Sequence, residues 1–410
     1  MTERSLAVLS AARVVRVDTP GLRVSGLVDI TISDGRILSI EPHSGPQDDA
    51  IDIGGRYVMP GLVNAHDHLY SKELRYPVAE MDLAAMRRQI DTRDEVETFA
   101  VMVANAWRGM AAGTLVIRDL GARHGLNTRL SEVFSKGLLF GPRVVAAGRP
   151  LVMTGGHVWT FGREADGPDE CRKAVREQRK AGAEVIKVMA SGGLSNFPNE
   201  DYTVSEFTGS ELEAITGEAK KLGIPTCAHA FGVDAVAAVV NAGIDSIEHG
   251  VHLDEATVAS MVTKGISYVP TMANMARIAS PKLNTKAGIP GRARRFAAEV
   301  VEPQIESVGR AAAAGVRIGV GTDSTGTYSE ELAALHGAGM TIEAVIRAAT
   351  VDGAAICRVD AGVIEVGRLA FINVYDEDPR VDLSMLTHPS SVFAGATHME
   401  RSQLESLVNT

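Results

Sequence analysis

One repeated pattern in the middle of the chain most limits what it can fold into. Four segments combine a glycine, a short apolar run and a polar residue, namely "AAGTLVIRDLG", "KAGAEVIKVMASGG", "NAGIDSIEHG" and "AAGVRIGVGTDS". Two more, "KLGIPTCAHAFG" and "TKGISYVPT", are close to it. Because glycine in this place is typical of a helix end, each unit indicates a helix followed by a buried strand. Six units with room for two more predict an α/β fold, a (β/α)8 TIM barrel.

The helices before these strands have start signals of their own. In "TGSELEAITGEAKKLG", Thr208 and Glu211 have the spacing of a capping box, and apolar residues follow at helical intervals. The segment "TRDEVETFAVMVANAWRGMAAG" repeats the plan with Thr92 and Glu95. We therefore expect capping boxes at Thr208 and at Thr92.

Both ends of the chain have a different, β-rich pattern. The segments "AARVVRVD", "GLVDITISDGRILSIEP" and "DDAIDIGGRYVMP" alternate apolar and polar residues between turn signals. The segments "EVGRLAFINVYDEDP" and "PSSVFAG" near the other end are similar. We predict a small β-sandwich domain built from residues 1–58 and 360–410, with the barrel formed by residues 59–359.

Polar residues occupy the ends of the predicted strands, where barrels of this type have their active sites. In "VMPGLVNAHDHLY", His66 and His68 follow an apolar run, and alternate residues of a strand point to the same side. The remaining strand-end residues, in chain order, are Asp119, Lys187, His229, His249, Thr271 and Asp323.

Each of these residues alone has an ordinary structural explanation. The first two histidines could flank a surface turn, and His229 could be a hydrogen-bonded core residue. Lys187 could extend its stem to the rim of the barrel, and Asp323 could cap the next helix. These explanations are less convincing together, because every one of these residues lies at the end of a predicted strand. Imidazole nitrogens and carboxylate oxygens suit zinc or a similar divalent ion.

Lys187 needs its own explanation, because an ammonium group cannot bind a metal ion. Buried beside metal ions, its amine would lose a proton and could react with carbon dioxide. The product, a carbamate, is a carboxylate that could bridge two metal ions. The residues therefore favour a centre with two divalent ions, and we expect zinc.

Charge and cysteine content limit the partners and the compartment. The 41 basic and 51 acidic side chains give a net charge of −10, which argues against nucleic acid or an anionic membrane surface. The cysteines Cys171, Cys227 and Cys357 form no CxxC pair, as is typical of a reducing compartment. No apolar stretch has the length of a signal-peptide core or a membrane span. We expect a cytoplasmic homo-oligomer that acts on a small molecule.

The motifs "GLVNAHDH", "IKVMASGG", "AHAFG", "SIEHG" and "GTDS" together resemble the amidohydrolase superfamily. The branch most similar is that of imidazolonepropionase-related amidohydrolases and metal-dependent prolidases, and the resemblance covers nearly the whole chain. It implies that the HxH pair and Asp323 bind the more buried of two metal ions. It also implies that His229 and His249 bind the other ion, and that carboxylated Lys187 bridges the two.

Two further residues follow from the same resemblance. His157, in "VMTGGHVW", matches a family histidine that faces the substrate, although it could also be a loop histidine near Trp159. Phe231, in "AHAFG", stands where many prolidase-like members have a tyrosine that contacts the substrate. This departure puts a dipeptide substrate in doubt and favours an apolar or aromatic group, unless the ring only packs in the barrel wall. In a second departure, "GRLAFINVYDEDP" lacks the Ala-Asp pair that family members usually have before the last strand. This departure concerns only the small β domain.

We therefore expect a binuclear hydrolase that cleaves an amide-type C–N bond with a hydroxide shared by two metal ions. Asp323 would take the proton of the hydroxide and deliver it to the leaving nitrogen, and His157 would assist the carbonyl. Expected substrates are N-acyl amino acids, dipeptides, or aryl amides, carbamates and ureas. One alternative is a single-metal ring-opening hydrolase or deaminase of the imidazolonepropionase type, against which Lys187 argues. The other is a non-catalytic scaffold, against which the complete ligand set argues.

Overall fold

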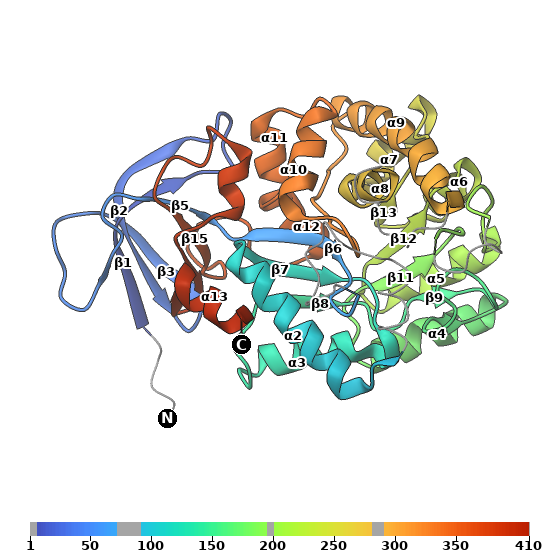
Figure 1. Cartoon of the computed structure of the whole chain (residues 1–410), viewed down its shortest axis with the longest axis horizontal. Helices are drawn as coiled ribbons and strands as arrows, with labels where there is room; N and C mark the ends of the chain where they lie inside the picture. Colours follow the sequence, from blue (N-terminus) through green and yellow to red (C-terminus); the bar gives the residue numbers. More distant parts are fainter. Residues whose placement is uncertain (1–5, 72–91, 195–200, 281–290, 410) are drawn as a thin grey trace.

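The computed structural model of the protein describes residues 6–71, 92–194, 201–280 and 291–409. It contains a mixed, mostly antiparallel sheet at one end and parallel strands surrounded by helices at the other (Figure 1). Among the helices that lie in these ranges, none combines the length and apolar character needed to cross a bilayer.

The mixed sheet, in which β1 pairs parallel with β4 and β5, joins strands from both ends of the chain. Its strands are β1 (Leu6–Val15), β2 (Val24–Ser33), β3 (Arg36–Pro42), β4 (Ile51–Asp52), β5 (Tyr57–Pro60), β15 (Phe371–Tyr375), β16 (Ser391–Ala394) and β17 (Thr397–Glu400). They form one eight-stranded sheet in the order β17-β16-β15-β5-β1-β2-β3, with β4 paired to β1. The join lies between β5 and β15, where Val58 is opposite Val374. An apolar core holds the two ends together because it includes Leu9, Ile30, Ile372 and Phe393.

In the second part, every strand pair within the described residues is parallel. Its strands are β6 (Leu62–Asp67), β7 (Thr114–Asp119), β8 (Arg143–Ala146), β9 (Leu151–Val152), β10 (Arg163–Glu164), β11 (Ile186–Met189), β12 (Thr226–Ala230), β13 (Ser246–His249) and β14 (Ser267–Val269). They form two sheets, in the orders β6-β7-β8 and β10-β9-β11-β12-β13-β14. The predicted α/β architecture with parallel strands is confirmed.

The segment of residues 317–323 lies between β14 and β6. Tyr268 N donates to Arg317 O at 2.9 Å, and Gly319 N donates to Tyr268 O at 2.9 Å. On the other side, Ala65 N donates to Val320 O at 2.7 Å, and Thr322 N donates to His66 O at 2.9 Å. This segment, predicted as a strand, makes only isolated bridges, and it brings its last residue next to the end of β6.

Helices cover the outside of the parallel strands (Figure 1). The helices before residue 250 are α2 (Glu95–Ala111), η2 (Arg123–Gly125), α3 (Leu126–Ser135), α4 (Pro168–Lys180), α5 (Gly209–Lys221) and α6 (Val233–Ala242). Those after it are α7 (Glu255–Lys264), α8 (Met272–Ala279), α9 (Gly291–Ala313), α10 (Tyr328–Gly337), α11 (Ile342–Ala348), α12 (Val351–Cys357), η4 (Leu383–Thr387) and α13 (Arg401–Asn409).

The predicted helix signals are correct in part. Thr208 and Glu211 form the expected capping box of α5. Left-handed Gly243 and Gly265 end α6 and α7, as the repeated pattern predicts. The capping box expected at Thr92 is wrong, because Asp94 caps α2 and pairs with Glu97 instead. Aspartate caps helices at least as well as threonine, so the helix begins after Asp94, which is closer than Thr92 to the apolar residues of the helix.

Candidate metal centre

The six predicted metal ligands lie at one end of the parallel strands. They are His66 at the end of β6, His68 just beyond it, Lys187 on β11, His229 on β12, His249 at the end of β13, and Asp323, the last residue of the 317–323 segment. Each is at most 9% exposed. Burial of so many ionisable groups in one place is costly unless they bind one another or a common partner.

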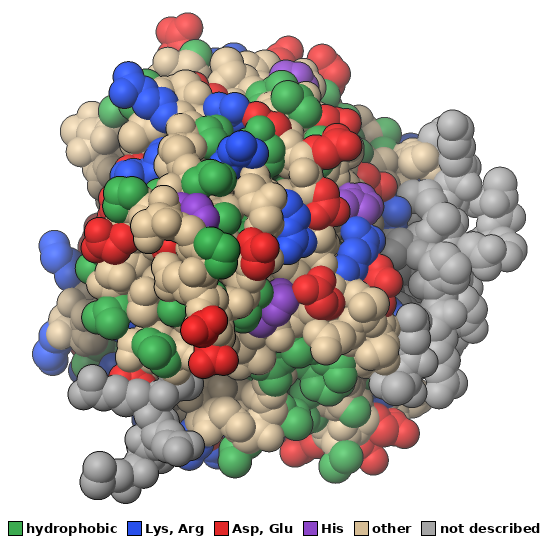
Figure 2. Space-filling view, turned by 90° about the vertical axis from the view of Figure 1, so that its left-hand side faces the viewer, with side chains coloured by type: hydrophobic (Ala, Val, Ile, Leu, Met, Phe, Trp, Pro, Cys, Tyr) green, Lys and Arg blue, Asp and Glu red, His purple; other side chains and the backbone are tan. Residues whose placement is uncertain are grey.

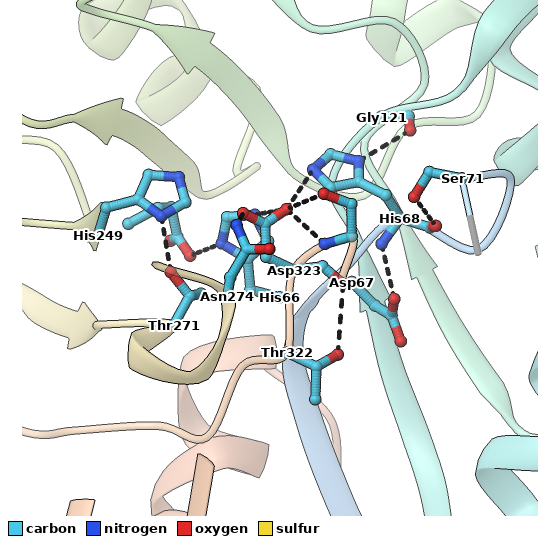
Figure 3. A network of polar contacts seen from close by, with 12 residues as sticks. His66, Asp67, His68, Ser71, Gly121, His249, Thr271, Asn274, Thr322 and Asp323 are labelled. Carbon is cyan, nitrogen blue, oxygen red and sulfur yellow. Dashed lines mark hydrogen bonds and ion pairs between the residues drawn. The ribbon is translucent and has the colours of Figure 1, made fainter. Parts of the chain in front are cut away.

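The histidine rings and the Asp323 carboxylate are close neighbours (Figure 3). The ring centroids of His66 and His249 are 5.0 Å apart, and those of His229 and His249 are 4.6 Å apart. Asp323 Oδ1 lies 3.9 Å from His66 Nε2 and 3.7 Å from His68 Nε2. His66, His249 and Asp323 each offer a ligand atom within 4.8 Å of the others. The cluster therefore consists of five side chains, namely His66, His68, His229, His249 and Asp323.

Hydrogen bonds fix which nitrogen of three histidines has a proton. His66 Nδ1 donates to Glu248 Oε2 at 2.8 Å, and His68 Nδ1 donates to Gly121 O at 3.1 Å. His229 Nε2 donates to Gly192 O at 3.2 Å. Carboxylate and carbonyl oxygens can only accept, so the bonded nitrogens have the hydrogens. In neutral rings, the opposite nitrogens then have the lone pairs that a metal needs.

Thr271 determines the tautomer of His249 in the same way. The Thr271 hydroxyl donates to Pro270 O at 2.6 Å and accepts a hydrogen from His249 Nδ1 at 2.7 Å. Burial, with a smaller effect of cationic neighbours, holds the pKa values of both His229 and His249 well below their usual value. Both rings are therefore neutral near pH 7, as metal ligands must be.

Lys187 is a buried amine in the middle of this group of strands. Among the described residues its Nζ has no hydrogen-bond partner. Burial is the main cause that lowers the pKa of Lys187, and Arg118 acts in the same direction. A neutral amine has the lone pair needed for reaction with carbon dioxide. The residue therefore has the chemical properties that a bridging carbamate requires, and the donor set around it suits divalent metal ions.

His157 lies against the same cluster. Its ring stacks on that of His229, with centroids 4.4 Å apart and planes at 23°. Its backbone N–H donates to both carboxylate oxygens of Glu206, at 3.1 and 3.0 Å. A Cβ on Gly193 would be only 2.6 Å from His157 Cε1, so a glycine there permits the ring position. The structure thus brings His157 to the predicted ligands.

Phe231 packs directly on two of the predicted ligands. Its ring is parallel to that of His249, with centroids 4.8 Å apart and planes at 1°, and it meets His229 edge-on. It is 2% exposed and belongs to an apolar cluster with Val251, Met275 and Phe296. Phe231 is therefore part of the wall beside the cluster, and its contact with a substrate stays a prediction.

Two buried charged residues next to the cluster, Glu248 and Arg118, were not predicted as site residues. Glu248 accepts from His66, and its other oxygen accepts from Arg118 Nη2 at 2.8 Å and from Ser246 Oγ at 2.7 Å. Arg118 Nε also donates to Ala65 O at 2.5 Å. Both residues stand inside apolar strands, in "LVIRDLG" and "SIEHG", and a charge in such a run was the signal available. They orient His66 from the side opposite to Asp323.

Asp119, another predicted strand-end residue, has a structural environment. Its carboxylate accepts hydrogen bonds from Leu69 N at 3.0 Å, from Gly121 N at 3.2 Å and from Asn127 Nδ2 at 2.9 Å. Burial raises its pKa to about 6. Asp119 thus holds the loop after His68 to the loop that supplies Gly121.

Comparisons with known proteins agree with this arrangement. The sequence model of the Amidohydrolase family matches residues 57–400. An uncharacterized protein of Mycobacterium tuberculosis is 30% identical in an alignment 403 positions long, which covers 93% of this chain and 95% of the relative. Ochratoxinase of Aspergillus niger is 27% identical in an alignment 366 positions long, which covers 82% of this chain and 73% of the enzyme. The crystal structure of a Xaa-Pro dipeptidase with bound methionine in the active site has a TM-score of 0.84 at 26% identity, covering 96% of this chain and 100% of that one.

Proposed function

Because the chain belongs to the amidohydrolase family and is a hydrolase acting on C–N bonds, we propose that it cleaves an amide-type bond with two divalent metal ions. One observation carries the proposal. Four buried histidines have one ring nitrogen turned to a hydrogen-bond acceptor and cluster with Asp323, and Lys187 on β11 has a buried amine without a hydrogen-bond partner among the described residues.

The ligands divide into two groups in this proposal. His66, His68 and Asp323 would hold one ion, which is supported by the 3.9 and 3.7 Å distances from Asp323 Oδ1 to the two Nε2 atoms. His229 and His249 would hold the second ion, and carboxylated Lys187 would be a ligand to both. We propose zinc, because a set of imidazole and carboxylate ligands suits it.

When bound, the two ions would supply Lewis acidity toward water and the substrate carbonyl. The residues of the chain perform the remaining steps. Asp323 takes the proton of the attacking water and gives it to the leaving nitrogen. His157 donates a hydrogen bond to the substrate carbonyl as negative charge develops on its oxygen. Ring stacking on His229 keeps His157 at that place.

The proposed substrates have an apolar or aromatic group on the acyl or leaving side. The ring of Phe231 provides only apolar surface beside His249, and the neighbouring cluster of Val251, Met275 and Phe296 is apolar as well. We therefore place N-acyl amino acids, aryl amides, carbamates and ureas before simple Xaa-Pro dipeptides, although a similar structure is a Xaa-Pro dipeptidase.

Metal counting and a substrate panel test the proposal together. The purified protein should contain two equivalents of metal per chain by elemental analysis, and removal of the metal should abolish hydrolysis. The zinc-loaded protein should hydrolyse at least one class among N-acyl amino acids, aryl carbamates, aryl ureas and prolyl dipeptides. A protein that binds zinc and hydrolyses none of them would contradict the proposed reaction.

A single-metal enzyme of the imidazolonepropionase type is the second candidate. It is favoured by the tight group of His66, His249 and Asp323, whose ligand atoms suit one ion. One metal equivalent, with an uncarboxylated Lys187 in a crystal structure of the metal-loaded protein, would support this alternative. Two equivalents and an added carboxyl group support the binuclear centre.

We also propose that the parallel strands close into a (β/α)8 barrel over residues 59–359, beside a β-sandwich of residues 1–58 and 360–410. Two connections support closure. Residues 317–323 bond to both β14 and β6, and Glu184 N, just before β11, donates to Ala146 O of β8 at 2.8 Å. The longer parallel sheet thus meets the shorter one at two places, at its end strand β14 and just before its inner strand β11.

A cytoplasmic location is proposed from the cysteines, since all three are buried and free of disulfides. A homo-oligomer without a nucleic-acid or membrane partner stays a proposal. The face of the molecule shown in Figure 2 has basic and acidic side chains interspersed, rather than gathered by sign.

A further inference from the structure

The first turn of α8 lies beside the predicted ligands and takes no part in the mechanism above. Thr271 just precedes this turn, and Asn274 lies within it (Figure 3). Asn274 Nδ2 donates to Asp323 Oδ2 at 2.6 Å, and both residues are buried. Since a hydrogen bond to a carboxylate is strong when buried, this contact is expected to decide how the Asp323 side chain is oriented.

The direction of the Asn274 amide follows from its partners. A carboxylate can only accept, so the amide nitrogen must face Asp323. On its other side, Asn274 Oδ1 accepts a hydrogen bond from the Thr325 hydroxyl, and Thr325 is buried too. The two contacts lock the amide in one orientation.

Asp323 is held so that its two oxygens have different surroundings. Oδ2 is bound by Asn274, whereas Oδ1 accepts from Ser324 N at 2.7 Å and faces His66 Nε2 and His68 Nε2. The backbone of Asp323 has a φ of +52°, which is unfavourable for a residue with a side chain. Such a conformation persists only where surrounding contacts hold it, and Asn274 provides one of them.

The turn is itself fixed by buried groups. Glu331 Oε2 accepts from Ala273 N at 2.7 Å, and Gln304 Nε2 donates to Pro270 O at 2.5 Å and to His249 O at 3.0 Å. Thr271, with a φ of +54°, accepts from His249. One short element thus contacts a predicted ligand of each metal ion.

We propose that Asn274 is a positioning residue that directs Asp323 Oδ1 toward the metal ion shared with His66 and His68. The inference rests on the proposed binuclear centre. Asn274 touches neither substrate nor reacting atoms and acts only through Asp323. Its loss should weaken the binding of one ion and leave the other nearly unchanged.

The experiment measures how fast the cobalt-loaded protein releases its metal to a chelator, and records the visible spectrum of the bound cobalt. Asn274→Leu keeps a similar volume but removes the donor. We expect it to accelerate release of one of two ions by about 10 to 100-fold and to change the cobalt spectrum, as loss of a partner of a metal ligand typically does. Thr325→Val, a smaller change that leaves Asn274 in place, should act in the same direction by less.

A double-mutant comparison separates positioning from general packing. In an Asp323→Ala background, Asn274→Leu should cause no further acceleration, because the group through which it acts is gone. Asn373→Leu is the packing control, since Asn373 Nδ2 donates to Gly113 O far from the cluster, and it should lower the melting temperature without altering release. Equal acceleration by Asn274→Leu with and without the Asp323 carboxylate would overturn the inference. Failure of the wild-type protein to take up cobalt would instead overturn the proposed centre itself, and the inference with it.

Discussion

Two His–Asp pairs in this molecule contain the same residue types and differ in geometry. In the mixed sheet, His43 Nδ1 lies 2.8 Å from Asp29 Oδ1, and Gln47 and Ala11 also donate to that carboxylate. At the ends of the parallel strands, Asp323 Oδ1 is 3.7 to 3.9 Å from the Nε2 atoms of His66 and His68. The His43–Asp29 distance is that of a hydrogen bond. The distances from Asp323 Oδ1 to the histidine nitrogens are too long for a hydrogen bond, but they are short enough for a single ion to contact the oxygen and a nitrogen at once.

The difference shows that residue type alone does not determine what a buried histidine does. In the sheet, the polar groups satisfy one another and connect the strands. At the strand ends, each histidine has one nitrogen bound to a protein acceptor and presents the other to its neighbours. The following changes test whether the two regions are as distinct as this comparison says.

The largest effect is expected from a matched pair of aspartate substitutions. Asp323→Asn should lower kcat by roughly 1000-fold or more, because the proton acceptor is lost, while much of the metal is retained. Asp29→Asn should leave kcat unchanged and lower the free energy of unfolding by about 1 to 3 kcal/mol, because it alters a buried hydrogen-bond network. Kinetics, metal analysis and denaturant unfolding check both. If Asp323→Asn turned substrate over within tenfold of the wild-type rate, the proton-acceptor role of Asp323 would be contradicted.

A second test concerns the buried amine. Lys187→Ala should lower activity by about 100 to 1000-fold and reduce the bound metal, since the bridging group is removed. Acetate added to this variant should restore part of the activity, because it can replace the carbamate. Lys221→Ala, on the exposed surface of α5, is the control and should behave as wild type. An unmodified Lys187 in a crystal structure of the metal-loaded wild type would be evidence against carboxylation.

A third test pairs two histidines. His157→Ala should retain both metal ions and lose about 100-fold in kcat, the typical cost of one lost contact to a developing oxyanion. His43→Ala should leave kcat unchanged and cost about 1 kcal/mol of stability through its lost hydrogen bond to Asp29. If His157→Ala turned substrate over at the wild-type rate, the assisting role assigned to His157 would be wrong.

The smallest effect is expected at Phe231. A tyrosine there could donate a hydrogen bond to a substrate carboxylate or carbonyl, so Phe231→Tyr should raise kcat/KM for a prolyl dipeptide relative to an aryl amide by about 10-fold. The reference is the wild-type ratio measured with the same two substrates. An unchanged ratio would mean that the ring serves only to pack against His249.

These tests concern residues that could be found from the sequence, whereas their supporting partners could not. The two-residue spacing of His66 and His68 and the repeated units place six strand-end side chains together without any structure. Glu248 and Asn274 could not be assigned, because their partners His66 and Asp323 lie 182 and 49 positions away in the chain. Periodicity shows which side of an element a residue occupies, but it gives no information on which distant side chain it contacts.

The same limit explains the position of Phe231. Its spacing from His229 correctly predicts that it lies near the ligands. The direction of its ring is determined by Val251 and Phe296, which come from other elements and pack on it. Local start signals are also ambiguous, as the capping box at Asp94 rather than Thr92 shows.

The pairing of β5 with β15 has a consequence for the synthesis of the protein. β5 ends at Pro60 and its antiparallel partner begins at Phe371, roughly 300 residues later. At about 5 to 20 residues per second, the ribosome needs roughly 15 to 60 s to produce that partner. Until then the N-terminal strands can form only a partial sheet, whose β5 edge has free backbone donors and acceptors. A cell that makes this protein must therefore protect that edge from other nascent chains, and slower translation would extend the period of risk.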